Sequence, residues 1–112
     1  MNDSATTALT CADETVWETR DGTQDGAGGI AWAASSTGNS LASGFGRLKE
    51  GGTPPKTLDY DEVIHVLKGT FGITCDGRQL VARAGDVLSL SRGSVVTYSG
   101  QDAEFFFVVT AV

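Results

Sequence analysis

Acidic residues and the only histidine of the chain stand together in the stretch from Asp59 to Gly77, which reads DYDEVIHVLKGTFGITCDG. Carboxylates and imidazoles are the side chains that most often move protons or hold a metal ion. Glu62 and His65 are therefore the first candidates for chemistry. If this stretch is a strand, its side chains alternate between two faces, so these two residues lie on opposite sides of it.

The composition is that of one globular domain. The chain has 112 residues and a net charge of -6, which argues against binding to nucleic acid or to anionic membranes. No apolar run approaches the length of a membrane span, and the polar, acidic N-terminus does not have the pattern of a signal peptide. We therefore expect a cytoplasmic protein in which Cys11 and Cys75 are reduced thiols.

Strand signals dominate the sequence, and helical signals are few. Val16 and Trp17 lie in a short alternating run, and the apolar runs on either side of residues 37–40 have the spacing of a hairpin. Asp76 and Gly77 predict a type I′ turn, which needs positive φ at both central residues. The later runs have the regular spacing of an antiparallel sandwich or small barrel. They are EVIHVLKG, TFGITC, RQLVARAG, DVLSLSRG, SVVTYSG and AEFFFVVTAV.

The run from Tyr60 to Ser94 resembles the cupins, and in particular the EutQ-type cupins of ethanolamine utilisation. Glu62 is followed seven positions later by Gly69, as in the first cupin motif, and Gly85 and Gly93 fit the glycines of the second. The likeness extends from about residue 43 to residue 109. It implies an all-β, single-domain cupin with a jelly-roll barrel, the double-stranded β-helix. We expect residues 1–14 to form a flexible tail and residues 15–112 to form the cupin domain.

The sequence departs from the family pattern at the metal ligands. Cupins hold their metal through three histidines and a glutamate, and of these four ligands the resemblance leaves only Glu62. One carboxylate does not make a tight transition-metal site. We therefore predict no metal site and no cofactor, and a loosely bound divalent metal stays open. The histidine positions fall on Pro55 and Thr57, or on Lys56 and Leu58, and on Val96.

Glu62 is the candidate for chemistry if it points into the barrel. Burial would raise the pKa of its carboxyl group toward neutrality and suit it to act as a general acid or base, with Tyr60 or Tyr98 as its partner in proton transfer. Alternatively, Arg47 or Lys49 neutralises Glu62, or the carboxylate holds the turn before its strand. His65 then packs against an outer element or a dimer partner, or is exposed, unless a bulge turns its ring toward a pocket.

The remaining candidates follow from strand faces. Val96 stands where an inward ligand is expected, so its neighbours Ser94 and Tyr98 are predicted to line the same cavity. In the run that ends before residue 50, one strand face has cationic and aromatic side chains. Such a face suits an anionic or aromatic ligand, although a solvated edge strand has the same pattern. We assign Trp32 and Phe107 to the core or the cavity wall. The face before residue 50 consists of Ser43, Phe45, Arg47 and Lys49.

Two functions remain open. The first is a small lyase, isomerase or cyclase in which Arg47 or Lys49 orients an anionic metabolite near Glu62. The second is a non-catalytic cupin that binds a ligand or serves in assembly, with side chains filling its barrel. The kinase activity associated with EutQ-type proteins has no phosphate-binding glycine loop to support it here, and Cys75 has no neighbouring base. In apolar runs such as FFFVV, the side chains point to both faces of the strand, so both faces must be covered. This predicts a homodimer.

Overall fold

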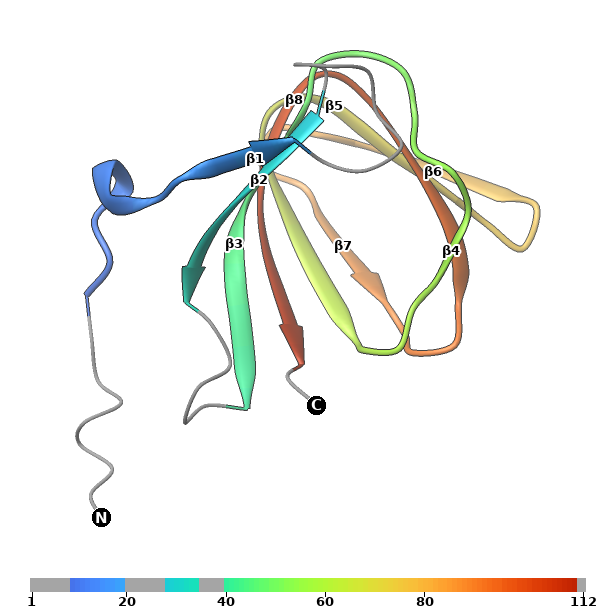
Figure 1. Cartoon of the computed structure of the whole chain (residues 1–112). Helices are drawn as coiled ribbons and strands as arrows, with labels where there is room; N and C mark the ends of the chain where they lie inside the picture. Colours follow the sequence, from blue (N-terminus) through green and yellow to red (C-terminus); the bar gives the residue numbers. More distant parts are fainter. Residues whose placement is uncertain (1–8, 20–27, 35–39, 111–112) are drawn as a thin grey trace.

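The computed structural model describes residues 9–19, 28–34 and 40–110 (Figure 1). Apart from a single 3₁₀ turn at Ala12–Glu14, the regular elements of the described residues are strands. The predicted all-β fold is confirmed. The strands are β1 (Trp17–Thr19), β2 (Gly28–Ala34), β3 (Leu41–Leu48), β4 (Lys56–Thr57), β5 (Glu62–Cys75), β6 (Arg78–Arg83), β7 (Val87–Leu90) and β8 (Val95–Thr110).

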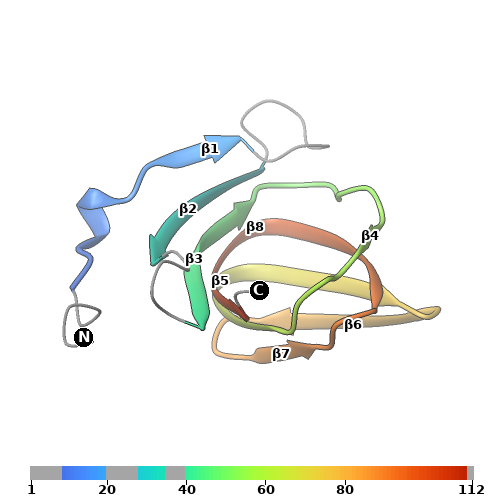
Figure 2. The same ribbon diagram turned by 60° about the horizontal axis from the view of Figure 1, so that its bottom comes forward.

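All pairings are antiparallel, and two long strands hold the barrel together. The main order is β1-β2-β3-β8-β5-β6, with β4 paired to β8 and β7 paired to β5. The first half of β5 lies between β7 and the end of β8, and its second half lies between β6 and the start of β8. Each long strand thus serves both sides of the barrel, whose curvature is plain in Figure 2.

The two long strands bend where their pairing is irregular. The β5–β8 register shifts between Val66 and Thr70, where Gly69 has a φ of 72° and Asp102 has a φ of 49°. A β-carbon on Gly69 would overlap the carbonyl oxygen of Asp102. Only glycine combines this conformation with so close a backbone approach. The sequence predicted two runs on either side of Gly69, and the structure joins them into one bent strand.

The predicted turns are present. Asp76 and Gly77 have φ values of 52° and 76°, as a type I′ turn requires, and they connect β5 to β6. The predicted hairpin pairs β2 with β3, and Trp17 begins the predicted short strand β1. The hairpin residues 37–39 and the tail residues 1–8 lie outside the described residues.

The alternation of side chains along β5 matches the prediction. Glu62, Ile64 and Val66 are buried inside the barrel, whereas Val63 and His65 are exposed on its outer face. His65 therefore points away from the barrel interior. Glu62 is the one charged or polar residue among the buried side chains of the described ranges, with 8% of its surface exposed.

No helix among the described residues is long and apolar enough to cross a membrane.

Candidate functional site

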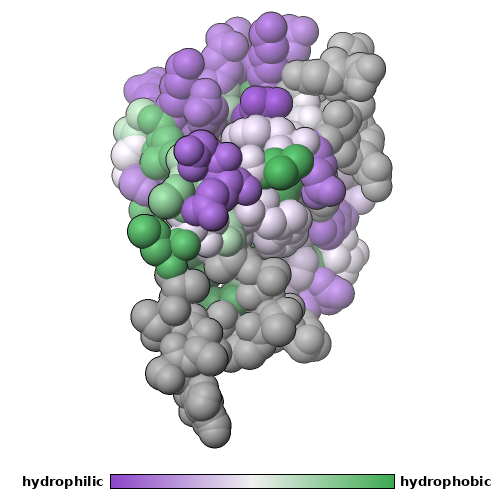
Figure 3. All heavy atoms as spheres, turned by 60° about the vertical axis from the view of Figure 1, so that its left-hand side comes forward, coloured by the Kyte–Doolittle hydropathy of each residue, from purple (hydrophilic) through white to green (hydrophobic). Residues whose placement is uncertain are grey.

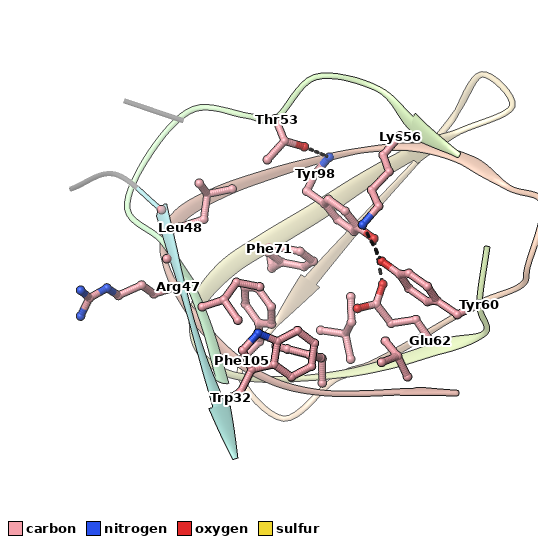
Figure 4. A pocket seen from close by; sticks show the side chains of 16 residues that line it. Trp32, Arg47, Leu48, Thr53, Lys56, Tyr60, Glu62, Phe71, Tyr98 and Phe105 are labelled. Carbon is pink, nitrogen blue, oxygen red and sulfur yellow. Dashed lines mark hydrogen bonds between the residues drawn. The ribbon is translucent and has the colours of Figure 1, made fainter. Parts of the chain in front are cut away.

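A cavity of about 200 Å³ opens inside the barrel, and Glu62 lies in its wall. One side of this cavity is polar and the other is apolar. Figure 4 shows the polar ends of Lys56, Tyr60, Glu62 and Tyr98 gathered on one side, with Trp32 and Phe105 on the other. The barrel is therefore not filled by its own side chains. The other lining residues are Gly28, Gly29, Ile30, Arg47, Leu48, Thr53, Ile64, Phe71, Phe107 and Val109.

The buried carboxylate is bound by a tyrosine from across the barrel. The Tyr98 hydroxyl donates a hydrogen bond of 2.8 Å to Oε1 of Glu62. Glu62 begins β5, and Tyr98 lies in the first half of β8, opposite Ile73 in the ladder. The bends in β5 and β8 bring these two positions face to face. The backbone N–H of Tyr98 also donates to Thr53 Oγ1 at 3.1 Å, which fixes the position of the tyrosine.

Lys56, which strand alternation did not predict as a site residue, supplies a cation at the cavity. Nζ of Lys56 donates a hydrogen bond of 2.8 Å to the hydroxyl oxygen of Tyr60. The phenolic proton of Tyr60 is not used in this bond and can be donated elsewhere. The segment is held by Leu58, which is fully buried and exchanges backbone hydrogen bonds with Gly93 and Ser94.

Asp61 positions Glu62 from outside the cavity. Its Oδ1 accepts the backbone N–H of Arg92 at 2.8 Å, and its own N–H donates to Thr110 Oγ1 at 3.0 Å. The backbone N–H of Thr110 in turn donates to the carbonyl oxygen of Asp61. These bonds fix the chain where β5 begins. The acidic residues before the strand thus have separate roles, since Asp61 is exposed and fixes the backbone while Glu62 is buried.

Aromatic rings form the apolar side of the cavity. Phe71 stacks on Tyr98 at 5.7 Å and contacts Phe105 at 4.5 Å between ring centroids. Trp32 meets Phe107 edge to face at 5.2 Å. Gly46 lies directly opposite Phe105 in the β3–β8 ladder, and a β-carbon there would overlap the Phe105 ring. The missing side chain lets the ring lie against β3.

The prediction that the cationic face of β3 lines the cavity is wrong for most of its residues. The inner face of β3 is the small one, which includes Gly44 and Gly46, because the phenylalanine rings of β8 occupy the space above it. Phe45 packs outside against Phe106 at 5.4 Å. The guanidinium of Arg47 lies 4.2 Å over the Trp17 ring and points away from Glu62 (Figure 4).

Figure 3 shows hydrophilic side chains gathered at the upper end of the molecule. Lys49 is exposed. It lines a shallow surface cavity together with Arg47, Lys68, Asp102 and Glu104. Ser43 stays on the outer face of β3 and does not line the barrel cavity. Glu62 therefore has neither Arg47 nor Lys49 as its cation.

Ser94 and Tyr98 do not share a cavity, which corrects another prediction. Ser94 and Val96 line a second hollow of about 210 Å³ between β6 and β7, together with Cys75 and Arg78. Val96 is fully buried, so its side chain belongs to the core between the two spaces. Ser94 precedes β8, and strand alternation does not extend to it. The predicted residues that line the barrel cavity are Tyr60, Glu62, Tyr98, Trp32 and Arg47, although the guanidinium of Arg47 points away from Glu62.

The donor atoms around Glu62 do not fit the metal that cupins hold. The cationic group beside the site is Lys56, and an ammonium group has no lone pair for a metal. Within the described ranges, one group of three possible ligands lies close together, the exposed Cys11, Asp13 and Glu14, on the 3₁₀ turn outside the barrel. There the backbone N–H of Cys11 donates to the Glu14 carboxylate and lowers its pKa. The absence of a metal and of a cofactor stays a prediction.

Comparison with known proteins supports the cupin assignment. A curated relative, the acetate kinase EutQ of Clostridioides difficile strain 630, is 37% identical over 70 residues, which cover 62% of this chain and 44% of the relative. The solved structure of a putative ethanolamine utilisation protein EutQ from Salmonella typhimurium LT2 has a TM-score of 0.78 and 25% identity, with 91% of this chain and 83% of that chain covered. An RmlC-like cupin from Shewanella frigidimarina has a TM-score of 0.76 at 15% identity, over 93% and 90% of the two chains, and shows the fold alone.

The extent of these matches matters for function. The chain spans only 30% to 44% of the curated relatives that it matches. The family described as "Ethanolamine utilisation protein EutQ" matches residues 22–111, which is most of the chain and includes strands β2 to β8. With the barrel, its neighbours and this match together, the chain belongs to the EutQ family of cupins.

Proposed function

We propose that this cupin binds a small anionic metabolite in its barrel and transfers a proton on it, as a lyase or isomerase does. Glu62 acts as the general acid or base. Lys56 and Tyr60 receive the negative charge of the ligand, or the charge that develops on its carbonyl oxygen. The observation that carries this proposal is that the Glu62–Tyr98 pair and the Lys56–Tyr60 pair, each bonded at 2.8 Å, line one cavity.

The chemistry of the two pairs supports these roles. A carboxylate is the usual base for removing a proton next to a carbonyl group, and the resulting enolate needs hydrogen-bond donors at its oxygen. Lys56 and Tyr60 both have protons that their mutual bond does not use. Tyr98 donates to Glu62 and holds the carboxylate toward the cavity. A small oxo acid, with a carboxylate and a carbonyl group, has the functional groups that such a site would take.

The size of the cavity limits the ligand. Its volume of about 200 Å³ corresponds to about seven water molecules at the volume of liquid water. A ligand enclosed within this volume has about seven non-hydrogen atoms. The aromatic side of the cavity favours a ligand with an apolar or planar part.

A non-catalytic ligand-binding module is the alternative. It predicts that small anions bind but that none of them is converted to a product. The open cavity argues against a barrel that is filled for assembly alone, and the carboxylate in its wall favours proton transfer over simple anion binding. A site that only bound anions would gain nothing from a buried negative charge.

The curated relatives are named acetate kinases, and this name bears on the ligand. Acetate is a small carboxylate, which is the ligand class that we propose for the barrel. Phosphoryl transfer also needs a site for a nucleotide, and the sequence has no phosphate-binding glycine loop to provide one. Incubation with acetate and ATP, followed by hydroxylamine trapping of acetyl phosphate, would test this activity in the present chain.

Exchange of carbon-bound hydrogen tests the main proposal without knowledge of the substrate. Small 2-oxo and 3-oxo acids are incubated in deuterium oxide, and exchange next to the carbonyl group is followed by NMR. We expect exchange above the buffer rate with at least one compound and a loss of about 100-fold or more in Glu62→Gln. Lys49→Met, which changes a cation outside the cavity, should leave the rate unchanged. Binding of these acids with no exchange would establish the non-catalytic alternative.

We also propose that the chain forms a homodimer through the outer face of β5, β7 and β8. Val63, Leu67 and Val87 are exposed there, and Phe106 is half-buried beside them. His65 lies among these apolar side chains, opposite Phe106 in the ladder. Apolar, charge-poor centres are typical of homodimer interfaces, and a two-fold axis lets such a face cover itself.

A further inference from the structure

Phe105 lines the cavity on the side opposite the polar groups. Its ring lies across from the ends of Lys56, Tyr60 and Glu62, with Phe71 between them (Figure 4). Phe105 is half-buried although it faces the barrel interior, because part of its ring borders open space. The residue therefore stands where the far end of a ligand held at Lys56 would arrive.

The position of this ring depends on Gly46. The two residues face each other in the β3–β8 ladder, and a β-carbon on Gly46 would overlap atoms of the Phe105 ring. On its other side the ring contacts Phe71 at 4.5 Å and lies 6.4 Å from Phe107 between ring centroids. The ring thus has β3 and these two phenylalanines as neighbours, and the cavity borders another part of it. A larger side chain at position 46 would push the ring into the ligand space.

We propose that the ring of Phe105, which packs against Gly46, limits the length of the ligand and restricts the barrel to short-chain carboxylates. This inference rests on the proposed function and names its substrate class. The carboxylate is held by Lys56 and Tyr60, and the hydrocarbon part extends along Phe71 toward Phe105. With room for about seven non-hydrogen atoms, the cavity is filled by a straight-chain acid of about five carbons.

The same strand provides a matched control. Phe106 is the neighbour of Phe105, but it points outward and packs on Phe45 at 5.4 Å. Phe105→Leu and Phe106→Leu therefore make the same chemical change on opposite faces of β8. Only the first of them enlarges the cavity.

The test is calorimetric titration of the full chain with the sodium salts of straight-chain acids from acetate to octanoate. Each buried methylene should raise the affinity about fourfold, up to about five carbons, and the affinity should fall beyond that length. Phe105→Leu should move the optimum to a longer acid, and Phe106→Leu should leave it in place. Gly46→Ala should move it to a shorter acid, and Phe105→Leu still decides the outcome if Gly46→Ala does not fold.

Two results would overturn the inference alone. One is an affinity that keeps rising to octanoate in the unaltered protein, and the other is an equal effect of the two leucine variants. Should oxo acids undergo Glu62-dependent exchange while none of the straight-chain acids binds, the length inference fails and the proposed function stands. Absence of both binding and exchange would overturn both proposals.

Discussion

Tyr98→Phe removes only the hydroxyl that donates to buried Glu62, and its cost can be worked from the structure. The bond is 2.8 Å long, and its acceptor is the carboxylate of Glu62, a residue with 8% of its surface exposed. A hydrogen bond to a charged group contributes about 1.5–3 kcal/mol, and a part-buried donor suggests about 2 kcal/mol. With a urea dependence of about 1.5 kcal/mol per molar, the midpoint of unfolding should fall by about 1.3 M.

A double-mutant cycle tests the reasoning behind this number. Glu62→Met removes the acceptor and leaves an apolar side chain of similar length. In that background Tyr98→Phe should cost less than about 0.5 kcal/mol, since the hydroxyl then has no carboxylate to bind. An equal cost of Tyr98→Phe in both backgrounds, measured by urea unfolding, would refute the assignment. Tyr60→Phe is the matched control, because the Tyr60 hydroxyl accepts its bond from Lys56.

Three further predictions concern the bend, the cation and the outer face. Gly69→Ala should destabilise the fold by more than about 2 kcal/mol in the same urea assay. Gly85 also has a positive φ, but the space around it is open, so Gly85→Ala should cost only about 1–2 kcal/mol. Lys56→Met should weaken the binding of small carboxylates at least about tenfold in calorimetry, whereas Lys49→Met should leave the affinity unchanged. An equal loss of affinity in both variants would show that the net charge of the protein, and not the position of Lys56, determines binding. Sedimentation should show a dimer for the unaltered chain and a monomer for Val63→Glu, and a monomeric unaltered chain would contradict the proposed interface.

Much of the fold could be predicted because local signals determine it. Asp76-Gly77 allows one kind of tight turn, and the alternation around Glu62 separates the inner from the outer side of β5. The bend at Gly69 was not predicted as part of one continuous strand. A glycine between two apolar runs looks the same in sequence whether it ends a strand or bends it. Its close approach to Asp102 depends on a partner strand far away in the chain.

The site was predicted only in part, for a related reason. Glu62 and Tyr98 could be placed inside by strand alternation, but Lys56 lies in the two-residue strand β4, which is too short to show a period. Its position depends on pairing with Val96 of β8. The cationic face of β3 was assigned to the cavity because charge suggested a ligand. The glycines on its other face were the better signal, since they make room for the rings of β8.

The pairing of β5 with β8 also determines when the site comes into existence. The hydrogen bonds that build it join residues 36 positions apart at Glu62 and Tyr98, 45 apart at Thr53 and Tyr98, and 49 apart at Asp61 and Thr110. Contacts between such distant residues form late, and barrels rich in them fold in milliseconds to seconds. During synthesis, Glu62 leaves the ribosome well before Tyr98. Until β8 follows, the nascent chain holds this carboxylate in water, with no cavity around it and no partner across the barrel.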